Sequence, residues 1–216
     1  MTLIDLSHAI ADGSVTYPGL PAPRITDYLS REASKARYAP GTTFHIARIE
    51  MVGNSGTYVD APSHRFEGRA DLSELRLEQL ADLDGLTIDA TGASRIIDGS
   101  FFAGRDLRGK AVLVHTGWSR HFGTPAYGEG SPYLTSAAAE LLVQAGAALV
   151  GIDSLNIDDT ADLARPAHTL LLDASIPIVE HMTNLAALPA SGFRFFAVPP
   201  RWRGVASFPV RAFAIL

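Results

Sequence analysis

The 216-residue sequence predicts one α/β domain, residues 1–216, with a mixed sheet and covering helices. Its length suits a single domain that buries a sizeable core. From Lys110 onward, apolar strand-like runs alternate with helical patterns, which is typical of parallel strands linked by helices. Before Lys110 the chain is rich in strand patterns. A sheet with both parallel and antiparallel strands accommodates the two halves.

Composition excludes several classes of function. Hydrophobic residues make up 47% and charged residues 19%, as in an ordinary globular protein. The net charge of −5 offers no basic surface for nucleic acid or anionic lipid. The absence of cysteine excludes disulfides, thiolate catalysis and zinc–thiolate sites. We see no leader sequence and no apolar run long enough to cross a bilayer, so we expect a cytoplasmic protein with no membrane partner.

The first half of the chain predicts short strands separated by loops. Leu3 to Leu6 alternates apolar and polar residues, as a strand would. The segment from Tyr17 to Pro23 contains three prolines and is therefore an extended loop. Thr43 to Val52 predicts a strand, whose apolar members include Phe44, Ile46 and Ile49. Leu86 to Ala90 predicts another.

The second half predicts the alternating part of the fold. Thr135 and Ser136 are typical caps for a helix that ends at Gly146. Pro166 suits the first turn of a second helix. The predicted strands of this half are Ala111 to His115, Ala148 to Ile152, Ile176 to Val179, Phe193 to Val198 and part of Val205 to Leu216.

The loop from Gly53 to His64 carries the first group of polar residues. Gly53 and Gly56 allow a tight backbone path, and Pro62 stiffens the turn that follows. Asp60 and His64 on such a loop can form a metal site or an acid–base pair. An Asx-type turn with a surface histidine is the alternative.

A second polar group follows the buried strand that ends at Ile152. Open α/β sheets bind ligands at this position, so we expect Asp153 and Asp158 to contribute there, and Asp159 to be a solvated turn residue. His168 opens a helix, and Glu180 closes the next strand twelve residues later. A helix packed antiparallel to that strand brings the two side chains to one edge of the sheet.

The loop from Asn54 to His64 resembles the signature of the cyclase family, which contains kynurenine formamidase-like and isatin hydrolase-like metal-dependent hydrolases. That signature is His-x-Gly-Thr-His-x-Asp-x-Pro-x-His. Asn54 and Tyr58 stand where the family has its first two histidines. The matching residues are Gly56, Thr57, Asp60, Pro62 and His64.

The resemblance implies the swivelling β/β/α fold and hydrolysis of an amide, imide or lactone bond in a small molecule. It assigns metal ligation to Asp60, His168 and Glu180, and the acid–base role to His64. An amide oxygen and a neutral phenol are poor ligands, so one divalent ion, Zn or Mn, is expected rather than two. The resemblance also implies a homodimer or homotetramer, and an arylformamidase-like activity on an aromatic substrate.

Other residues are candidates for contact with that substrate. Asn54 and Tyr58 should face the pocket whatever their chemistry, and Tyr17, Phe66 and Trp118 would suit an aromatic ligand. Arg201 and Arg203 could bind a carboxylate, although a solvated loop explains them equally well. The alternative function is a metal-free cyclase or a small-molecule-binding protein on the same fold. In a metal-free cyclase, Tyr58 and His64 would act as acid and base.

Overall fold

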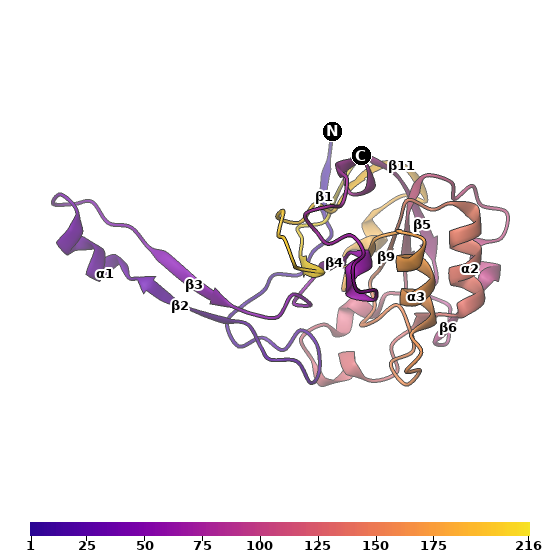
Figure 1. Ribbon diagram of the computed structural model, residues 1–216, viewed down its shortest axis with the longest axis horizontal. Coiled ribbons are helices and arrows are strands. Elements are labelled where there is room, and N and C mark those ends of the chain that lie inside the picture. Colours follow the sequence, from indigo (N-terminus) through magenta and orange to yellow (C-terminus); the bar gives the residue numbers. More distant parts are fainter.

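A nine-stranded mixed sheet forms the body of the molecule (Figure 1). The computed structural model describes residues 1–216. The strand order is β1-β13-β11-β5-β7-β9-β10-β4-β12, and β5, β7, β9 and β10 run parallel to one another. These strands are β1 (Leu3–Asp5), β4 (Tyr58–Asp60), β5 (Leu83–Asp89), β7 (Lys110–His115), β9 (Leu149–Ile152), β10 (Ile178–Glu180), β11 (Ser191–Phe196), β12 (Ser207–Pro209) and β13 (Phe213–Ile215). The predicted α/β fold with a mixed sheet is confirmed.

The parallel strands are buried on both faces because their side chains alternate between two cores. Val112 and Val114 of β7 enter the core that also contains residues of helices α2 (Ser136–Ala145) and α3 (Pro166–Asp173). Ala111 and Leu113 enter the second core, with residues of β11 and β13. Thr135 caps α2, as predicted, by accepting a hydrogen bond from the amide of Ala138.

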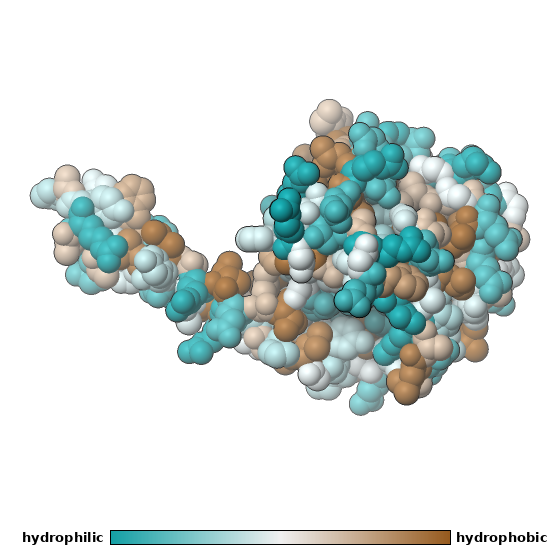
Figure 2. Space-filling model, in the orientation of Figure 1, coloured by the Kyte–Doolittle hydropathy of each residue, from teal (hydrophilic) through white to brown (hydrophobic).

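An arm extends far from the body on one side (Figure 1). It consists of β2 (Arg24–Leu29), the short helix α1 (Arg31–Ser34) and β3 (Ile46–Glu50), and β2 pairs only with β3. The strand predicted from Thr43 to Val52 is present, but all of β3 is exposed. Phe44, Ile46 and Ile49 are 51%, 46% and 60% exposed. The apolar residues of this segment therefore lie on a face of the arm that the body of the same chain does not cover. Hydrophobic groups are visible along the arm in Figure 2.

Short elements complete the structure. Two parallel two-residue strands, β6 (Ile96–Ile97) and β8 (Tyr133–Leu134), pair beside α2. None of the helices has the length and apolar character that crossing a bilayer requires. The 3₁₀ turns are η1 (Lys35–Arg37), η2 (Pro62–His64), η3 (Leu77–Gln79), η4 (Gly99–Phe102), η5 (Trp118–His121), η6 (Pro125–Gly128) and η7 (Leu185–Ala187).

Candidate active site

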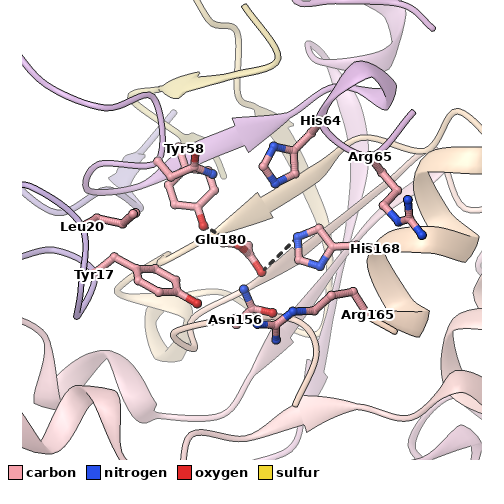
Figure 3. Close-up of a pocket in the computed structure, with 10 residues that line it drawn as sticks. Tyr17, Leu20, Tyr58, His64, Arg65, Asn156, Arg165, His168 and Glu180 are labelled. Carbon is pink, nitrogen blue, oxygen red and sulfur yellow. Dashed lines mark hydrogen bonds and ion pairs between the residues drawn. The ribbon is translucent and has the colours of Figure 1, made fainter. Parts of the chain in front are cut away.

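A cavity of about 340 Å³ lies where β4 and β10 meet the start of α3 (Figure 3). It combines aromatic, acidic, basic and amide side chains in a space suited to a small molecule. The lining residues are Tyr17, Leu20, Asn54, Tyr58, His64, Arg65, Asn156, Arg165, His168 and Glu180.

The register of β4 fixes one side of this cavity. β4 lies between β10 and β12, both antiparallel to it, so that Tyr58 is opposite Glu180 and Asp60 is opposite Ser207. Directly opposed residues in antiparallel strands share a face of the sheet. The Tyr58 hydroxyl therefore donates to Glu180 Oε2 at 2.5 Å, and the Ser207 hydroxyl donates to Asp60 Oδ1.

His64 is placed by the turn that follows β4. Pro62 opens the 3₁₀ turn η2, and the amide of His64 donates to the carbonyl of Ala61. This turn brings His64 Nδ1 to 3.0 Å from the Ser207 hydroxyl and 3.8 Å from Asp60 Oδ1. The side chain is 35% exposed, whereas Asp60 is fully buried. His64 can thus reach both the buried carboxylate and a ligand in the cavity.

Asp158 orients His168 from behind. Its carboxylate accepts hydrogen bonds from the amides of Ala167 and His168, and its Oδ2 lies 2.7 Å from His168 Nδ1. It therefore caps α3 and fixes the imidazole at the same time. A carboxylate on one ring nitrogen, with the other nitrogen directed into a cavity, is the usual support of a metal-binding histidine.

Two buried carboxylates lie close to Nε2 of His168. His168 Nε2 lies 3.7 Å from Asp60 Oδ2 and 3.8 Å from Glu180 Oε1. Asp60 Oδ2 is buried and has no hydrogen-bond partner. Asp60, His64 and His168 each offer one ligand atom, and these three atoms lie within 4.8 Å of one another. With metal–ligand bonds near 2.1 Å, donors of one ion are separated by about 3–4 Å. The residues present therefore fit a divalent ion.

The charges around the His168 side chain favour a cation. Burial alone would lower the pKa of His168, but Glu180, Asp158 and Asp60 together raise it well above its ordinary value. Burial raises the pKa of Glu180, and repulsion from Asp60 adds to that rise, while His168 opposes it. Burial alone would raise the pKa of Asp60, but His64, His168 and Ser207 lower it. A positive charge at this position, carried by a proton or a metal ion, compensates the buried carboxylates.

Tyr58 closes the other side of Glu180. The phenol is buried and donates to Glu180 Oε2, while the amide of Ile157 donates to Oε1 at 2.5 Å. Burial and the nearby charges of Glu180 and Asp60 raise the pKa of Tyr58 well above its ordinary value, so the phenol keeps its proton. The Asn54 amide nitrogen lies 3.5 Å from Asp60 Oδ1. These two residues hydrogen-bond the carboxylates as neutral donors.

Most of the predicted site residues meet at this cavity. Tyr17, Asn54, Tyr58, His64, His168 and Glu180 line it, and Asp60 lies buried within hydrogen-bonding reach of Ser207 behind it. Phe66 and Trp118 do not line it. The Phe66 ring packs against the core between Arg65 and Arg69, and Trp118 donates its indole N–H to the carbonyl of Tyr127 at 3.0 Å.

Two other polar candidates have structural roles. Asp153 accepts from the amides of Thr116 and Gly117 and from the Thr116 hydroxyl, so it fastens the turn after β7 and does not line the cavity. The expectation that Asp153 contributes to the ligand site is therefore wrong. Arg201 lines a different cavity and donates to the carbonyl of Ser73.

The structure also adds residues that the sequence reasoning did not assign. Ser207 reaches Asp60 only through the register of β12 on β4, for which the sequence carries no local signal. Asn156 and Arg165 line the cavity from the loop between β9 and α3. The position of this loop could have indicated them, because the loop follows the carboxyl end of a parallel strand, where open α/β sheets bind their ligands.

A second layer of buried aromatic rings lies behind Tyr58. His181 is fully buried, and its ring lies 5.2 Å from that of Tyr58 and 5.4 Å from that of Tyr127. Neither ring nitrogen of His181 has a hydrogen-bond partner. Burial, with a smaller contribution from nearby His8, lowers the pKa of His181 to about 3. His181 is therefore a neutral packing group at neutral pH.

Comparison with known proteins agrees with this geometry. The family described as "Putative cyclase" matches residues 4–159. The chain belongs to the cyclase family. Its relatives include the kynurenine formamidase of Salinibacter ruber, 26% identical over 98% of this chain and 96% of that protein. The kynurenine formamidase of Bacillus cytotoxicus is 27% identical over 97% and 95%.

Solved structures of cyclase-family enzymes share the fold. Isatin hydrolase A from Labrenzia aggregata, bound to benzyl benzoate, superposes with a TM-score of 0.83 at 23% identity, covering 99% of this chain and 93% of that one. A structure described as a potential metal-dependent hydrolase with cyclase activity gives 0.81 at 24% identity, covering 99% and 96%.

Proposed function

We propose that this chain is a hydrolase that cleaves an amide, imide or lactone bond in a small molecule, with one divalent metal ion. The observation that carries the proposal is the set of ligand atoms that Asp60, His64 and His168 offer within 4.8 Å of one another, with Glu180 Oε1 at 3.8 Å from His168 Nε2. The kynurenine formamidases and isatin hydrolases among its relatives support cleavage of a carbon–nitrogen bond, and an arylformamidase-like activity is the closest parallel.

Asp60 and His168 would hold the ion, with Glu180 as the third ligand. The donor set of oxygen and nitrogen suits zinc or manganese. His64 is the competing third ligand, because its ring nitrogen lies within 4.8 Å of the ligand atoms of Asp60 and His168, and this close group does not include Glu180. We assign His64 to proton transfer because it is partly exposed to the cavity and its Nδ1 is within hydrogen-bonding distance of Ser207.

When bound, the ion would supply Lewis-acid activation of the scissile carbonyl and of a water molecule. His64 would take the proton of the attacking water and return it to the leaving nitrogen or oxygen. Ser207 holds the His64 ring, and Asp158 holds the His168 ring, so neither imidazole must reorient during the reaction. The Tyr58 hydroxyl keeps Glu180 in a single position.

A second ion does not fit the residues present. Asn54 and Tyr58 stand at the two signature positions where the family has histidines, and the Tyr58 proton is already committed to Glu180. We therefore propose one metal ion per chain.

Elemental analysis of the purified protein, with activity before and after a chelator, tests this proposal. The substrate panel should contain aryl formamides, cyclic imides and lactones, with zinc or manganese restored separately after chelation. We expect about one ion per chain and loss of activity on its removal. Full activity in the metal-free protein would overturn the proposed mechanism.

A second candidate function is favoured by the contact between Tyr58 and Glu180. Tyr58, whose hydroxyl donates to Glu180 at 2.5 Å, and His64 both line the cavity, and they would act as acid and base without a metal. A metal-free cyclase or a small-molecule-binding protein would use this arrangement. Stoichiometric ligand binding by the chelated protein, with or without turnover, would support it.

We also propose that the chain forms a homodimer or homotetramer through its arm. An isolated two-stranded ribbon is marginally stable in water, and this one exposes Tyr28, Phe44, Ile46 and Ile49. A second copy would cover these side chains. Light scattering on the purified protein measures the mass, and a monomer would contradict this part of the proposal.

A further inference from the structure

One side of the cavity consists of residues that can donate hydrogen bonds. These residues have no role in the proposed hydrolysis. Tyr17, Asn156 and Arg165 lie together there, across from His64 and Tyr58 (Figure 3). Tyr17 comes from the proline-rich loop, and the other two come from the segment between β9 and α3. A phenol, an amide and a guanidinium from separate segments can all donate to one acceptor.

The guanidinium of Arg165 forms no ion pair within the protein. Its only hydrogen bond runs from Nη1 to the backbone carbonyl of Asp159 at 3.0 Å. The carboxylate of Asp159 pairs instead with Arg95, at 3.4 Å. Arg165 is half-buried, and a guanidinium offers five N–H donors. Four of them have no partner in the protein, although Arg165 lines the cavity.

The backbone of Arg165 has a strained conformation. Arg165 precedes α3 with φ 50° and ψ 59°, in the left-handed region. A non-glycine residue is disfavoured there and persists where the surrounding structure or the function requires it. Asparagine or glycine would adopt this conformation more easily. The cap of α3 does not require arginine, because Asp158 already accepts the amides of the first turn.

The charges in the cavity leave room for an anion. Asp60, Asp158 and Glu180 are buried carboxylates, and one divalent ion would compensate two of them. Arg165 adds one positive charge to the lining of the cavity. Arg65 adds a further positive charge at the exposed rim, where its Nε donates to the Thr169 hydroxyl and it forms no ion pair. A negatively charged ligand therefore meets no net repulsion.

We propose that Arg165, together with Asn156 and Tyr17, binds a carboxylate of the substrate. The substrate class is then an amide, imide or lactone that carries a carboxylate near the scissile bond. This inference rests on the proposed hydrolase function for the bond that is cleaved. The anion site itself rests only on the residues that line the cavity. Arg165 would be a specificity-determining residue, because a guanidinium can bind a carboxylate in a bidentate manner.

The test compares two substrates that differ only in the carboxylate, 2-formamidobenzoate and formanilide. Wild-type protein should prefer 2-formamidobenzoate. Arg165→Gln should lower kcat/KM for it by about 10–100-fold, mainly through KM, because hydrogen bonds to charged groups contribute about 1.5–3 kcal/mol. Hydrolysis of formanilide should change less than about twofold. Arg201→Gln makes the same charge change at another cavity and is the control, with no expected effect on either substrate.

Binding without turnover separates this inference from the proposed function. Calorimetric titration of the metal-loaded protein should show that benzoate binds and benzamide does not, and Arg165→Gln should abolish the difference. If neither formamide is hydrolysed but this difference holds, the anion site stands and the hydrolase proposal falls. Equal losses on both substrates, or equal binding of benzoate and benzamide by the wild type, would overturn the anion site. Arg165→Asn, which suits the left-handed backbone, repeats the test if Arg165→Gln does not fold.

Discussion

The retained half and the replaced half of the signature loop differ in how their polar atoms are hydrogen-bonded. The retained half ends in Asp60 and His64, and it leaves a buried oxygen, Asp60 Oδ2, without any partner in the protein. The replaced half, Asn54 and Tyr58, hydrogen-bonds its neighbours: the phenol is bound to Glu180, and the amide lies 3.5 Å from Asp60. Unmet lone pairs beside a buried histidine attract a cation, whereas satisfied donors do not.

The comparison shows that the residues at the two replaced ligand positions take part in the hydrogen bonding of the site. Tyr58 adopts a structural role by fixing Glu180, which is its direct neighbour across the strands. The same carboxylate therefore faces His168 with one oxygen and the phenol with the other.

The largest effect should come from His64 in the retained half. His64→Ala should lower turnover by about 10²–10⁴-fold, the range expected for a lost general acid–base group. Metal content and thermal stability should stay nearly unchanged, and His45→Ala on the exposed arm serves as the control. Elemental analysis, melting temperature and rate are measured on one preparation. Metal loss in parallel with activity would make His64 a ligand.

Asp158 should matter next, as a positioning residue behind His168. Asp158→Asn should weaken metal affinity by about 10–100-fold, as expected for a carboxylate that supports a ligating histidine. Asp153→Asn is a matched control, because Asp153 is also a buried carboxylate after β9 that accepts backbone amides. It should lower stability without changing metal affinity, measured by competition with a chelating dye. Equal affinities in the two variants would remove Asp158 from this role.

The replaced half should accept an ion once its chemistry is restored. The double variant Asn54→His, Tyr58→His supplies two imidazoles, which are far better ligands than an amide or a phenol. Metal content should rise from one ion per chain toward two. Tyr58→Phe removes the hydroxyl without adding a ligand, so its metal content should stay at one. An unchanged stoichiometry in a folded double variant would show that the substitutions are not what limits the second ion.

The smallest effect concerns the neutral packing layer behind Tyr58. His181 has a pKa of about 3 in the folded state, and its ordinary value is near 6.5. Between these pH values the unfolded chain binds a proton that the folded chain does not, so stability falls as the pH falls. Each unit below 6.5 costs about 1.4 kcal/mol from this residue.

His181→Phe tests that statement. Urea unfolding at pH 7.5, 6 and 5 should show a shallower loss of stability in the variant than in the wild type. The absolute stability at pH 7.5 serves as the reference, since the side chain is neutral there in both states. Parallel profiles would mean that His181 accepts a proton in the folded protein.

The sequence predicted some residues of the cavity, such as His168 and Glu180, better than it predicted others, such as Ser207 and Arg165. His168 and Glu180 could be paired because a helix start and a strand end meet at one sheet edge, and both line the cavity. Ser207 could not be found, because its place depends on the register of β12 on β4, more than 140 positions away. The sequence shows Arg165 only as the residue before a predicted helix, and its place in the lining of the cavity could not be predicted from that position.

The arm shows a different limit. The apolar alternation in Thr43 to Val52 correctly predicts a strand, but periodicity carries no information about what will cover its face. Trp118 and Phe66 illustrate the same point within the body. Their aromatic character suited a ligand, yet Trp118 donates its indole N–H to the carbonyl of Tyr127 and Phe66 packs against the core.

Because the arm is exposed, amide hydrogen exchange can show whether the chain assembles into an oligomer. The bonds between β2 and β3 are the only ladder that holds this ribbon, and no core side chain of the body packs on β3. In a free chain its amides would open locally and exchange with solvent deuterium almost at once. The amides of β7, buried in the middle of the sheet, would exchange only on global unfolding. In an assembly that covers the arm, protection of residues 46–50 would depend on protein concentration, while that of residues 110–115 would not.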